Sequence, residues 1–421
     1  MKKLLFPWIS VILSYSFIAL IFTYPLILHL NNSLAGIGGG DGFVYLWNIF
    51  EFWNEIGKGQ NPFFSGSIFY PIGANLAFHT YAPLISVLGF LFLNQLVIFL
   101  NLMVISSLIF ASTTAFLLAK YLTKNNLLSW VSGLIYGFSP VMVAFLSSQH
   151  YYFAFAAGLL PLGFLMSVKF FQTIKIKYVI FMILFFWACF LIDYYTAVIY
   201  LVVIIVTLAS QFFSLLIYSK KDLSLFFTNK QLTNYLLTFF LFLTVPTTVI
   251  FLLTFNLADF KNWFGSQTSY PSICSTNLAG FLIPSKLNPQ LSGVADFLYG
   301  RFGISEQVDT PSYYLGFIFL SLAIVAIFKF WKLTYIRIST ILGIIILLLS
   351  LGPIIKVGTR EFLSGSQTLF YWFSKMPFLG LIDCPIRFSI GLQLAMVVLV
   401  TLLFSKMMFR NGNFKKVIPI L

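Results

Sequence analysis

Long apolar runs separated by short polar turns recur along the whole chain. A helix crosses the hydrocarbon core of a bilayer with about 20 apolar residues, and many of the runs approach or exceed that length. The pattern therefore predicts an all-α protein, a polytopic bundle of about ten transmembrane helices. The predicted spans are 5–30, 95–119, 127–147, 152–170, 178–194, 197–218, 232–255, 312–328, 338–353 and 386–405.

The composition excludes a soluble globular protein. Of the 421 residues, 60% are hydrophobic and only 9% are charged, and the mean hydropathy is +0.96. The net charge of +14 would suit a nucleic-acid partner, but the Lys and Arg residues sit in short turns between apolar runs. We therefore expect contacts with the lipid bilayer and no nucleic-acid partner.

The basic turns predict an orientation in the membrane. All eleven acidic residues except Asp222, and all three histidines, lie at the opposite ends of the spans from these turns. Because cytoplasmic loops carry the excess of positive charge, we expect a multi-pass protein of the plasma (inner) membrane, with a cytoplasmic N-terminus and an extracytoplasmic active face. Most of the 25 Lys and Arg residues lie in the turns near 2–3, 120–124, 169–177, 220–230, 329–337 and 406–416.

The chain reads as one transmembrane domain, 1–421, with three long outer segments. The first apolar run exceeds the core of a signal peptide, about 7–15 residues, so we expect it to remain as a span. The residues after Lys416 are apolar again, which resembles the start of another span. This predicts that the chain is a C-terminally truncated member of a family of longer proteins. The outer segments are 31–94, 256–311 and 354–385.

The first outer segment is predicted to carry helices that lie in the membrane interface. Between 42 and 58, apolar side chains recur at helical spacing opposite Asn48, Glu51 and Glu55, which is typical of an amphipathic helix. The short apolar run 80–94 predicts a second interfacial or re-entrant helix. The apolar positions of the first helix are Phe43, Leu46, Trp47, Phe50 and Trp53.

The three cysteines, Cys189, Cys274 and Cys384, do not have the spacing of a metal site. Cys274 and Cys384 fall in segments predicted to face one oxidising compartment, so they could form a disulfide, although the sequence does not say whether the two loops meet. Phosphate-binding loops, zinc motifs, the GxSxG elbow and dinucleotide fingerprints are absent from the sequence.

Asp41 is the most distinctive polar residue, because it follows the glycine-rich stretch 36–40 directly after the first predicted span. It could cap the helix predicted at 42–58, with its carboxylate accepting backbone N–H groups. It could also take a proton from an acceptor hydroxyl at the water–lipid boundary, or hold a divalent cation. One side chain could serve in both roles.

Two histidines stand with Asp41 on the predicted outer face. His79 closes the first outer loop and His150 ends the third predicted span. Each could be an ordinary interfacial residue. Together with Asp41 they could bind phosphate or a metal ion.

Asp193 and Arg387 are ionisable residues at the outer ends of predicted spans. Asp193 is either functional or part of a tight hairpin turn. Arg387 either snorkels to the interface or uses its guanidinium to hold a lipid phosphate. Lys286 and Arg301 are weaker candidates for the same phosphate role.

Aromatic residues near these positions could stack on a sugar ring, or could belong to the aromatic belt of the membrane interface. Few ionisable residues fall inside the predicted spans, which argues against a proton relay or an ion-coupled transporter. The aromatic candidates are Trp47, Tyr70, Tyr151 and Tyr195.

Short motifs between about residue 5 and residue 405 carry a resemblance to a known family. They are Thr23-Tyr24-Pro25-Leu26, Gly40-Asp41-Gly42, Tyr45-Leu46-Trp47-Asn48, Asn61-Pro62-Phe63, Phe69-Tyr70-Pro71-Ile72-Gly73, His79, Phe138-Ser139-Pro140, His150, Leu351-Gly352-Pro353 and Pro385-Ile386-Arg387-Phe388. In these residues the chain resembles the GT-C-type membrane glycosyltransferases, which include protein mannosyltransferases and lipid A aminoarabinose transferases. The similarity is closest to the uncharacterised bacterial branch.

The resemblance implies a helical bundle whose large first outer loop carries two interfacial helices. It implies transfer of a sugar, with inversion, from a polyprenyl-phosphate carrier to a glycan, lipid or protein acceptor on the outer face. Asp41 would deprotonate the acceptor hydroxyl, and Arg387 would stabilise the departing lipid phosphate. Several members have paired acids where this chain has a lone aspartate, so no cofactor is certain and a divalent metal is only a candidate. The implied substrate-binding residues are His79, His150, Asp193, Arg387, Tyr70, Lys286 and Arg301.

Two other functions stay open: a transporter or flippase for a lipid-linked glycan, and a non-catalytic scaffold in envelope-glycan assembly. A transporter should carry polar groups along the axis of the bundle and helices that break in mid-span. The polar residues of this chain gather at one membrane face instead, which favours the enzyme.

Overall fold

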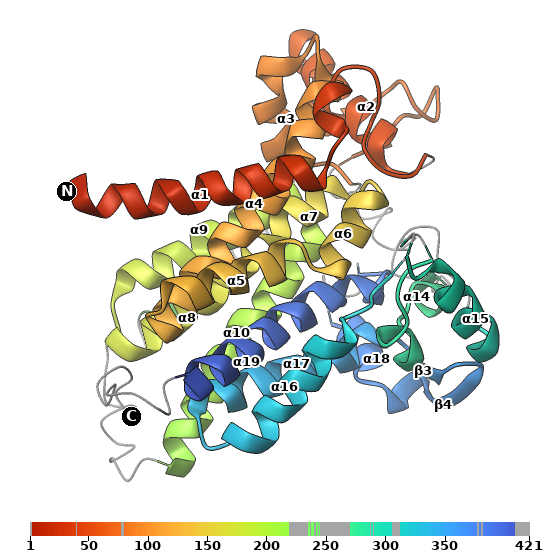
Figure 1. The fold of residues 1–421 in the computed structure, drawn as a ribbon. Coiled ribbons are helices and arrows are strands. Elements are labelled where there is room, and N and C mark those ends of the chain that lie inside the picture. Colours follow the sequence, from red (N-terminus) through yellow and green to blue (C-terminus); the bar gives the residue numbers. More distant parts are fainter. Residues whose placement is uncertain are drawn as a thin grey trace.

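The computed structural model confirms a mostly helical protein (Figure 1). Helices with an apolar surface bury it against one another, and here they do so in one extended core that joins residues from Ala19 to Leu403. The residues that the structure describes are 2–38, 40–76, 80–218, 270–286, 290–304, 312–376 and 382–408, with the single positions 235, 237–239, 241, 242, 244, 288 and 379.

The bundle is built around two long helices, α4 (Leu96–Thr123) and α19 (Ser389–Met408). Around α4 pack α1 (Lys2–Phe22), α5 (Asn126–Gly137), α7 (Tyr151–Ala157) and α8 (Leu160–Thr173). Around α19 pack α5, α16 (Phe317–Phe330) and α17 (Thr334–Ser350). The remaining bundle helices are α6 (Pro140–Ser147), α9 (Ile176–Ile192) and α10 (Tyr194–Tyr218).

The outer segments form small elements beyond one end of the bundle (Figure 1). The first holds η1 (Leu26–Leu28), α2 (Gly42–Gly57), the antiparallel pair β1 (Phe64–Ser65) and β2 (Ala74–Asn75), α3 (Pro83–Gly89) and η2 (Phe90–Phe92). The second holds α14 (Tyr270–Ile273), η3 (Leu278–Phe281) and α15 (Ser292–Phe302). The third holds the antiparallel pair β3 (Ile354–Val357) and β4 (Arg360–Ser364), η4 (Gly365–Gln367), α18 (Leu369–Ser374) and η6 (Pro385–Phe388).

Five helices among the described residues are long and apolar enough to cross a membrane. Each coincides with a predicted span, and 232–255 lies largely outside the described residues. Three other predicted spans correspond to apolar helices of fewer than 18 residues, namely α9, α16 and α17, and the first predicted span corresponds to α1. The run 80–94, predicted to be a second short helix of the outer segment, contains the short helices α3 and η2. The five long helices are Leu96–Thr123, Asn126–Ser147, Tyr151–Thr173, Tyr194–Ser214 and Pro385–Met408.

Three predicted spans differ from the structure in their continuity. The first helix ends at Phe22, because Pro25 follows and the chain turns into η1. The span predicted at 127–147 breaks between α5 and α6, where Ser139 caps the new helix at Pro140. The span predicted at 152–170 breaks between α7 and α8 at Gly158.

Three of the basic turns, near 120–124, 169–177 and 329–337, lie together at the end of the bundle opposite the outer segments (Figure 1). The ammonium groups of Lys124 and Lys169 lie 4.3 Å and 5.0 Å from the ring centre of Tyr121, so the α4–α5 turn contacts the end of α8. Gln172 at the same end bonds both Tyr121 and Tyr335 of α17. These three described turns are thus separated from the outer segments.

Candidate functional site

The loop between α1 and α2 is held to the bundle by a buried asparagine of α4. Asn101, fully buried, donates through Nδ2 to the carbonyls of Leu30 at 2.9 Å and Ser33 at 2.7 Å. Its Oδ1 accepts the N–H of Ala35 at 3.0 Å. A polar side chain deep in an apolar helix must find such partners, and here they fix the path of the loop that carries Asp41.

Glycines in this loop allow it to touch the turn between α6 and α7. A Cβ at Gly36 would lie 2.6 Å from the carbonyl oxygen of Ser147, and φ at Gly36 is +106°. A Cβ at Gly40 would lie 2.7 Å from the carbonyl oxygen of Ser148. Side chains at these positions would push the loop away from the bundle, so the glycine-rich stretch positions Asp41.

Asp41 occupies the N-cap position of α2, but its carboxylate makes no capping hydrogen bond. The Oε1 atom of Gln149 accepts the N–H of Gly42, the first residue of the helix, at 3.2 Å. The alternative that the Asp41 side chain caps the helix is therefore not what the structure shows, because its carboxylate points to other groups and accepts no N–H of the first turn. The Asp41 carboxylate is left for other partners.

Those partners are His150 and Tyr45. The Oδ2 atom of Asp41 lies 3.2 Å from Nδ1 of His150 and accepts the Tyr45 hydroxyl at 3.4 Å. The Tyr45 ring stacks on Tyr152 with 3.9 Å between centroids. The Asp41 side chain is 34% exposed whereas that of His150 is only 5% exposed, so Asp41 is the group that an incoming molecule can reach.

The surroundings keep Asp41 ionised and Tyr45 protonated. Burial acts to raise the pKa of Asp41, but the hydrogen bond and charge of His150, with the charge of Arg387, lower it below its usual value. Burial, followed by the charge of Asp41, raises the pKa of Tyr45 well above its usual value. At neutral pH Asp41 is thus a carboxylate and Tyr45 a hydrogen-bond donor to it.

Asp193 lies at the turn between α9 and α10 and faces Arg387. Its Oδ2 atom accepts the N–H and the hydroxyl of Thr196, each at 2.7 Å, which caps the start of α10. Its Oδ1 atom lies 4.0 Å from Nη1 of Arg387. One oxygen is therefore structural and the other faces the guanidinium.

Arg387 is buried, so the alternative that it snorkels into the interface is wrong. Its guanidinium carbon lies 4.2 Å above the ring of Tyr195 and 5.7 Å from that of Phe153, and the residue is 9% exposed. Tyr195 donates its hydroxyl to Asp383. Within the described residues, Nε of Arg387 has no hydrogen-bond partner.

A disulfide joins Cys274 to Cys384, so this pairing, which the sequence left open, is present. The N–H of Ile386 also donates to the carbonyl of Cys274 at 3.0 Å. The second outer segment is thereby tied to η6, the short helix that carries Arg387. Cys189 is a free, buried thiol.

The structure brings four of the predicted site residues into one group, which we call the outer polar cluster. His79 lies outside the described residues. Tyr70 is 86% exposed between β1 and β2. Lys286 pairs with Asp296 at 3.2 Å, and Arg301 is exposed at the end of α15; neither has a described contact with the cluster. The cluster comprises Asp41, Tyr45, His150, Asp193, Tyr195, Asp383 and Arg387.

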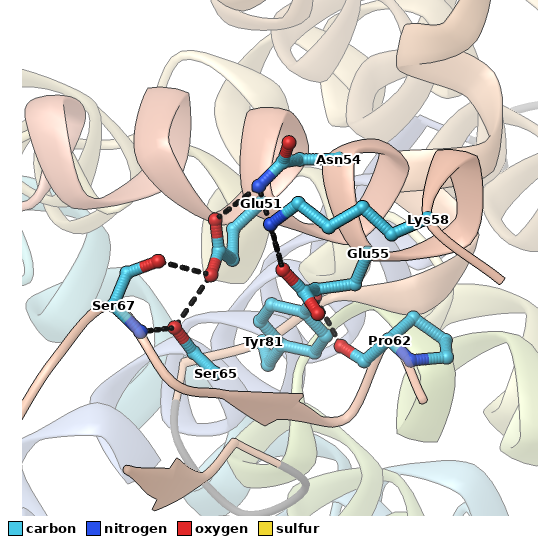
Figure 2. Close-up of polar contacts among 8 residues, drawn as sticks. All are labelled: Glu51, Asn54, Glu55, Lys58, Pro62, Ser65, Ser67 and Tyr81. Atoms are coloured by element: carbon cyan, nitrogen blue, oxygen red, sulfur yellow. Dashed lines mark hydrogen bonds and ion pairs between the residues drawn. The ribbon is translucent and has the colours of Figure 1, made fainter. Parts of the chain in front are cut away.

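The polar face of α2 is buried and organises the first outer loop (Figure 2). Glu51 accepts hydrogen bonds from Ser65 at 2.5 Å, Ser67 at 3.1 Å and Asn54 at 3.2 Å. Glu55 forms an ion pair with Lys58 at 2.7 Å. The helix predicted at 42–58 is confirmed, with its polar face turned toward the loop and its apolar Phe43 and Phe50 exposed.

Four contributors to the site were not proposed as site residues from the sequence, namely Tyr45, Asn101, Gln149 and Asp383. Tyr45 is four residues after Asp41 on a helix, and that spacing could have indicated the contact. Asn101 is an isolated amide in an apolar run, which is itself a signal. Gln149 gives no local signal, because its partner is distant in the sequence.

The cluster combines an accessible carboxylate with a buried guanidinium at the outer ends of apolar helices. Such a pair can accept a proton from one group and stabilise negative charge on another. Among the described residues, no three His, Cys, Asp or Glu side chains are grouped so as to hold a metal ion. No protein-family model and no curated protein sequence matches this chain.

Proposed function

We propose that this protein is an integral membrane glycosyltransferase of the GT-C type. It would move a hexosyl or pentosyl group from a polyprenyl-phosphate carrier to an acceptor on the outer face, with inversion. The observation that carries the proposal is the state of Asp41. Its carboxylate is accessible and makes no capping hydrogen bond, although it stands at the start of a helix, and His150 and the charge of Arg387 lower its pKa.

The proposal includes about ten spans, a cytoplasmic N-terminus and an extracytoplasmic active face in the plasma membrane. Five long apolar helices support the membrane location. The contact between Lys124, Lys169 and Tyr121 supports the orientation, because it gathers basic turns at the end opposite Asp41. Exposed apolar side chains on α1 and α16, including Phe17 and Phe328, would face lipid.

In the proposed reaction, the Asp41 carboxylate takes the proton from an acceptor hydroxyl. The hydroxyl oxygen attacks the anomeric carbon of the donor sugar from the face opposite the phosphate, and a new glycosidic bond forms with inverted configuration. The bond between that carbon and the phosphate oxygen breaks, and polyprenyl phosphate leaves. His150 and Tyr45 hold Asp41 in place, and their bonds keep it ionised.

Arg387 would stabilise the negative charge that develops on the departing phosphate. It is available for this role because its ion pair with Asp193 is long, at 4.0 Å, and its Nε has no partner among the described residues. A guanidinium stacked on Tyr195 keeps one orientation, which suits a bidentate grip on phosphate oxygens.

The test is sugar transfer in membranes that carry wild type, Asp41→Asn or the control Asp296→Asn, with radiolabelled polyprenyl-phosphate sugars as donors. Asp296 is an exposed carboxylate that pairs with Lys286 away from the cluster. We expect Asp41→Asn to lose about 10²-fold or more of the activity and the control to keep it. Equal activity in all three proteins would contradict the assignment of Asp41.

A transporter or flippase for a lipid-linked glycan is the second candidate, because one observation favours it. Two predicted spans break, at Ser139-Pro140 and at Gly158, and transporters often bind substrate at broken helices. The test is the movement of a fluorescent lipid-linked glycan across the bilayer of proteoliposomes. Movement that is equally fast with wild type and Asp41→Asn would support the transporter over the enzyme.

A further inference from the structure

A cavity of about 640 Å³ lies between the exposed face of α2 and the start of α4. It is on the other side of α2 from Tyr45 and Asn48, which are buried toward the bundle and the outer loop. The volume is that of an ordinary small-molecule site, about 300–1,000 Å³. Nothing in the proposed chemistry of Asp41 uses this cavity.

The cavity has one aromatic wall and one amide wall. Phe43, Trp47 and Phe50 from successive turns of α2 form the aromatic wall, and Phe43 and Phe50 are 67% and 56% exposed. The amide wall is made by Asn31, Asn94 and Gln95. All three amide residues are exposed, and their side chains form no hydrogen bond to any other residue within the described ranges.

The chemistry of the two walls indicates a neutral sugar. The C–H face of a sugar ring packs on an aromatic face, and its hydroxyls both donate and accept, as do the amides of Asn and Gln. The described residues that line the cavity carry no charge, so nothing there balances a phosphate or a carboxylate. A polyprenyl chain would leave the three amides facing hydrocarbon without partners.

The cavity is also close to the proposed catalytic carboxylate. Phe43 follows Asp41 by two residues, so their Cα atoms are at most about 7 Å apart. A chain of sugars could therefore pass from the cavity around the start of α2 to Asp41. Asn31 lies on the same loop, which Asn101 holds to the bundle.

We propose that this aromatic–amide cavity binds a neutral sugar of the acceptor, and thus that the acceptor is a glycan. The identification of the ligand as the acceptor rests on the proposed glycosyltransferase function. The binding of a neutral sugar rests only on the cavity. The two claims can therefore fail separately.

The experiment measures binding of maltotriose, mannotriose and chitotriose, with a galacturonic acid trimer as the charged comparison, to purified wild-type protein by ligand-observed NMR. The variants are Trp47→Ala, Gln95→Ala and the control Trp372→Ala, an exposed tryptophan of α18. We expect at least one neutral trimer to bind wild type, the acidic trimer not to bind, and Trp47→Ala to weaken binding about tenfold. Gln95→Ala should weaken it less, and Trp372→Ala should not change it.

Asp41→Asn separates the two claims, because it should lose transfer and keep trimer binding. Where transfer is measurable, Trp47→Ala should raise the KM for the acceptor and leave kcat unchanged. If a neutral trimer binds but no donor supports sugar transfer, the proposed glycosyltransferase function is contradicted and the sugar-binding cavity is supported. The sugar site is overturned if no neutral trimer binds wild type, or if Trp47→Ala binds it as well as wild type does.

Discussion

At the scale of single residues, two aspartates at helix starts have different tasks because their surroundings differ. Asp193 uses one oxygen to cap α10 through Thr196. Asp41 stands at the start of α2 without capping it, since its carboxylate lies against His150 and Tyr45. An aspartate that is free of its usual structural role, and held instead by His150, is the clearest mark of a functional group in this protein.

The lowered pKa of Asp41 makes a prediction about stability and pH. Because the folded state binds this proton less readily than the unfolded state does, the ionised carboxylate stabilises the fold above its usual pKa of about 3.9. That contribution is lost as the pH falls through the lowered value. The difference in unfolding midpoint between wild type and Asp41→Asn in detergent should be steady near neutral pH and shrink below about pH 4. If the difference in unfolding midpoint grew as the pH fell, the predicted stabilisation by the ionised carboxylate would be contradicted.

At the scale of an element, different parts of α2 contribute to three features: the outer polar cluster, the first outer loop and the cavity. Its start presents Asp41 to the outer polar cluster. Its buried polar face holds the first outer loop through Glu51 (Figure 2). Its other face lines the cavity with Phe43, Trp47 and Phe50. A distortion of α2 would therefore disturb all three at once.

Glu51 should be the residue on which the first outer loop depends. Glu51→Ala would leave Ser65, Ser67 and Asn54 without their shared buried acceptor, at a cost of about 2–3 kcal/mol. Hydrogen exchange at residues 64–76 should speed up by about 10-fold or more.

The matched control for Glu51 lies in the other outer hairpin. Glu361→Ala removes an ion pair with Lys356 at 3.2 Å, but the Glu361 side chain is 55% exposed. An exposed pair contributes about 0–1 kcal/mol, so exchange in that hairpin should change little. A larger effect for Glu361→Ala than for Glu51→Ala would contradict the role of Glu51.

At the scale of the whole molecule, the two halves of the bundle meet at the outer polar cluster. Asp41 and His150 come from the first half, and Arg387 comes from η6, directly before the last helix, α19. The Cys274–Cys384 disulfide fixes the second outer segment beside Arg387. The cluster therefore exists only when both halves are packed together.

The disulfide predicts a thiol count for the purified protein. Denatured, unreduced protein should take one maleimide mass tag, on Cys189, and reduced protein should take three, for the three cysteines of the chain. Closing a loop of this length is worth about 2–5 kcal/mol, so the Cys274→Ser, Cys384→Ser double variant should unfold at a lower temperature. Three tags without reduction would show that the bond is not formed.

The sequence by itself determined the class of structure. Apolar runs, helix-breaking prolines and the placement of charge are local features, so they predicted a helical membrane protein, the amphipathic helix at 42–58 and the face on which acidic residues gather. They also selected Asp41, His150, Asp193 and Arg387 as candidates. These positions stand out because charged residues are rare in a chain this apolar.

Only the tertiary structure decided what these candidates contact. Gln149 reaches Gly42 across 107 residues, and Cys274 reaches Cys384 across 110. Pairs so distant in sequence have no periodicity that could reveal them, because their proximity depends on how α4, α7 and α19 pack. That packing placed the Asp41 carboxylate beside His150 and buried Arg387 beside Asp193.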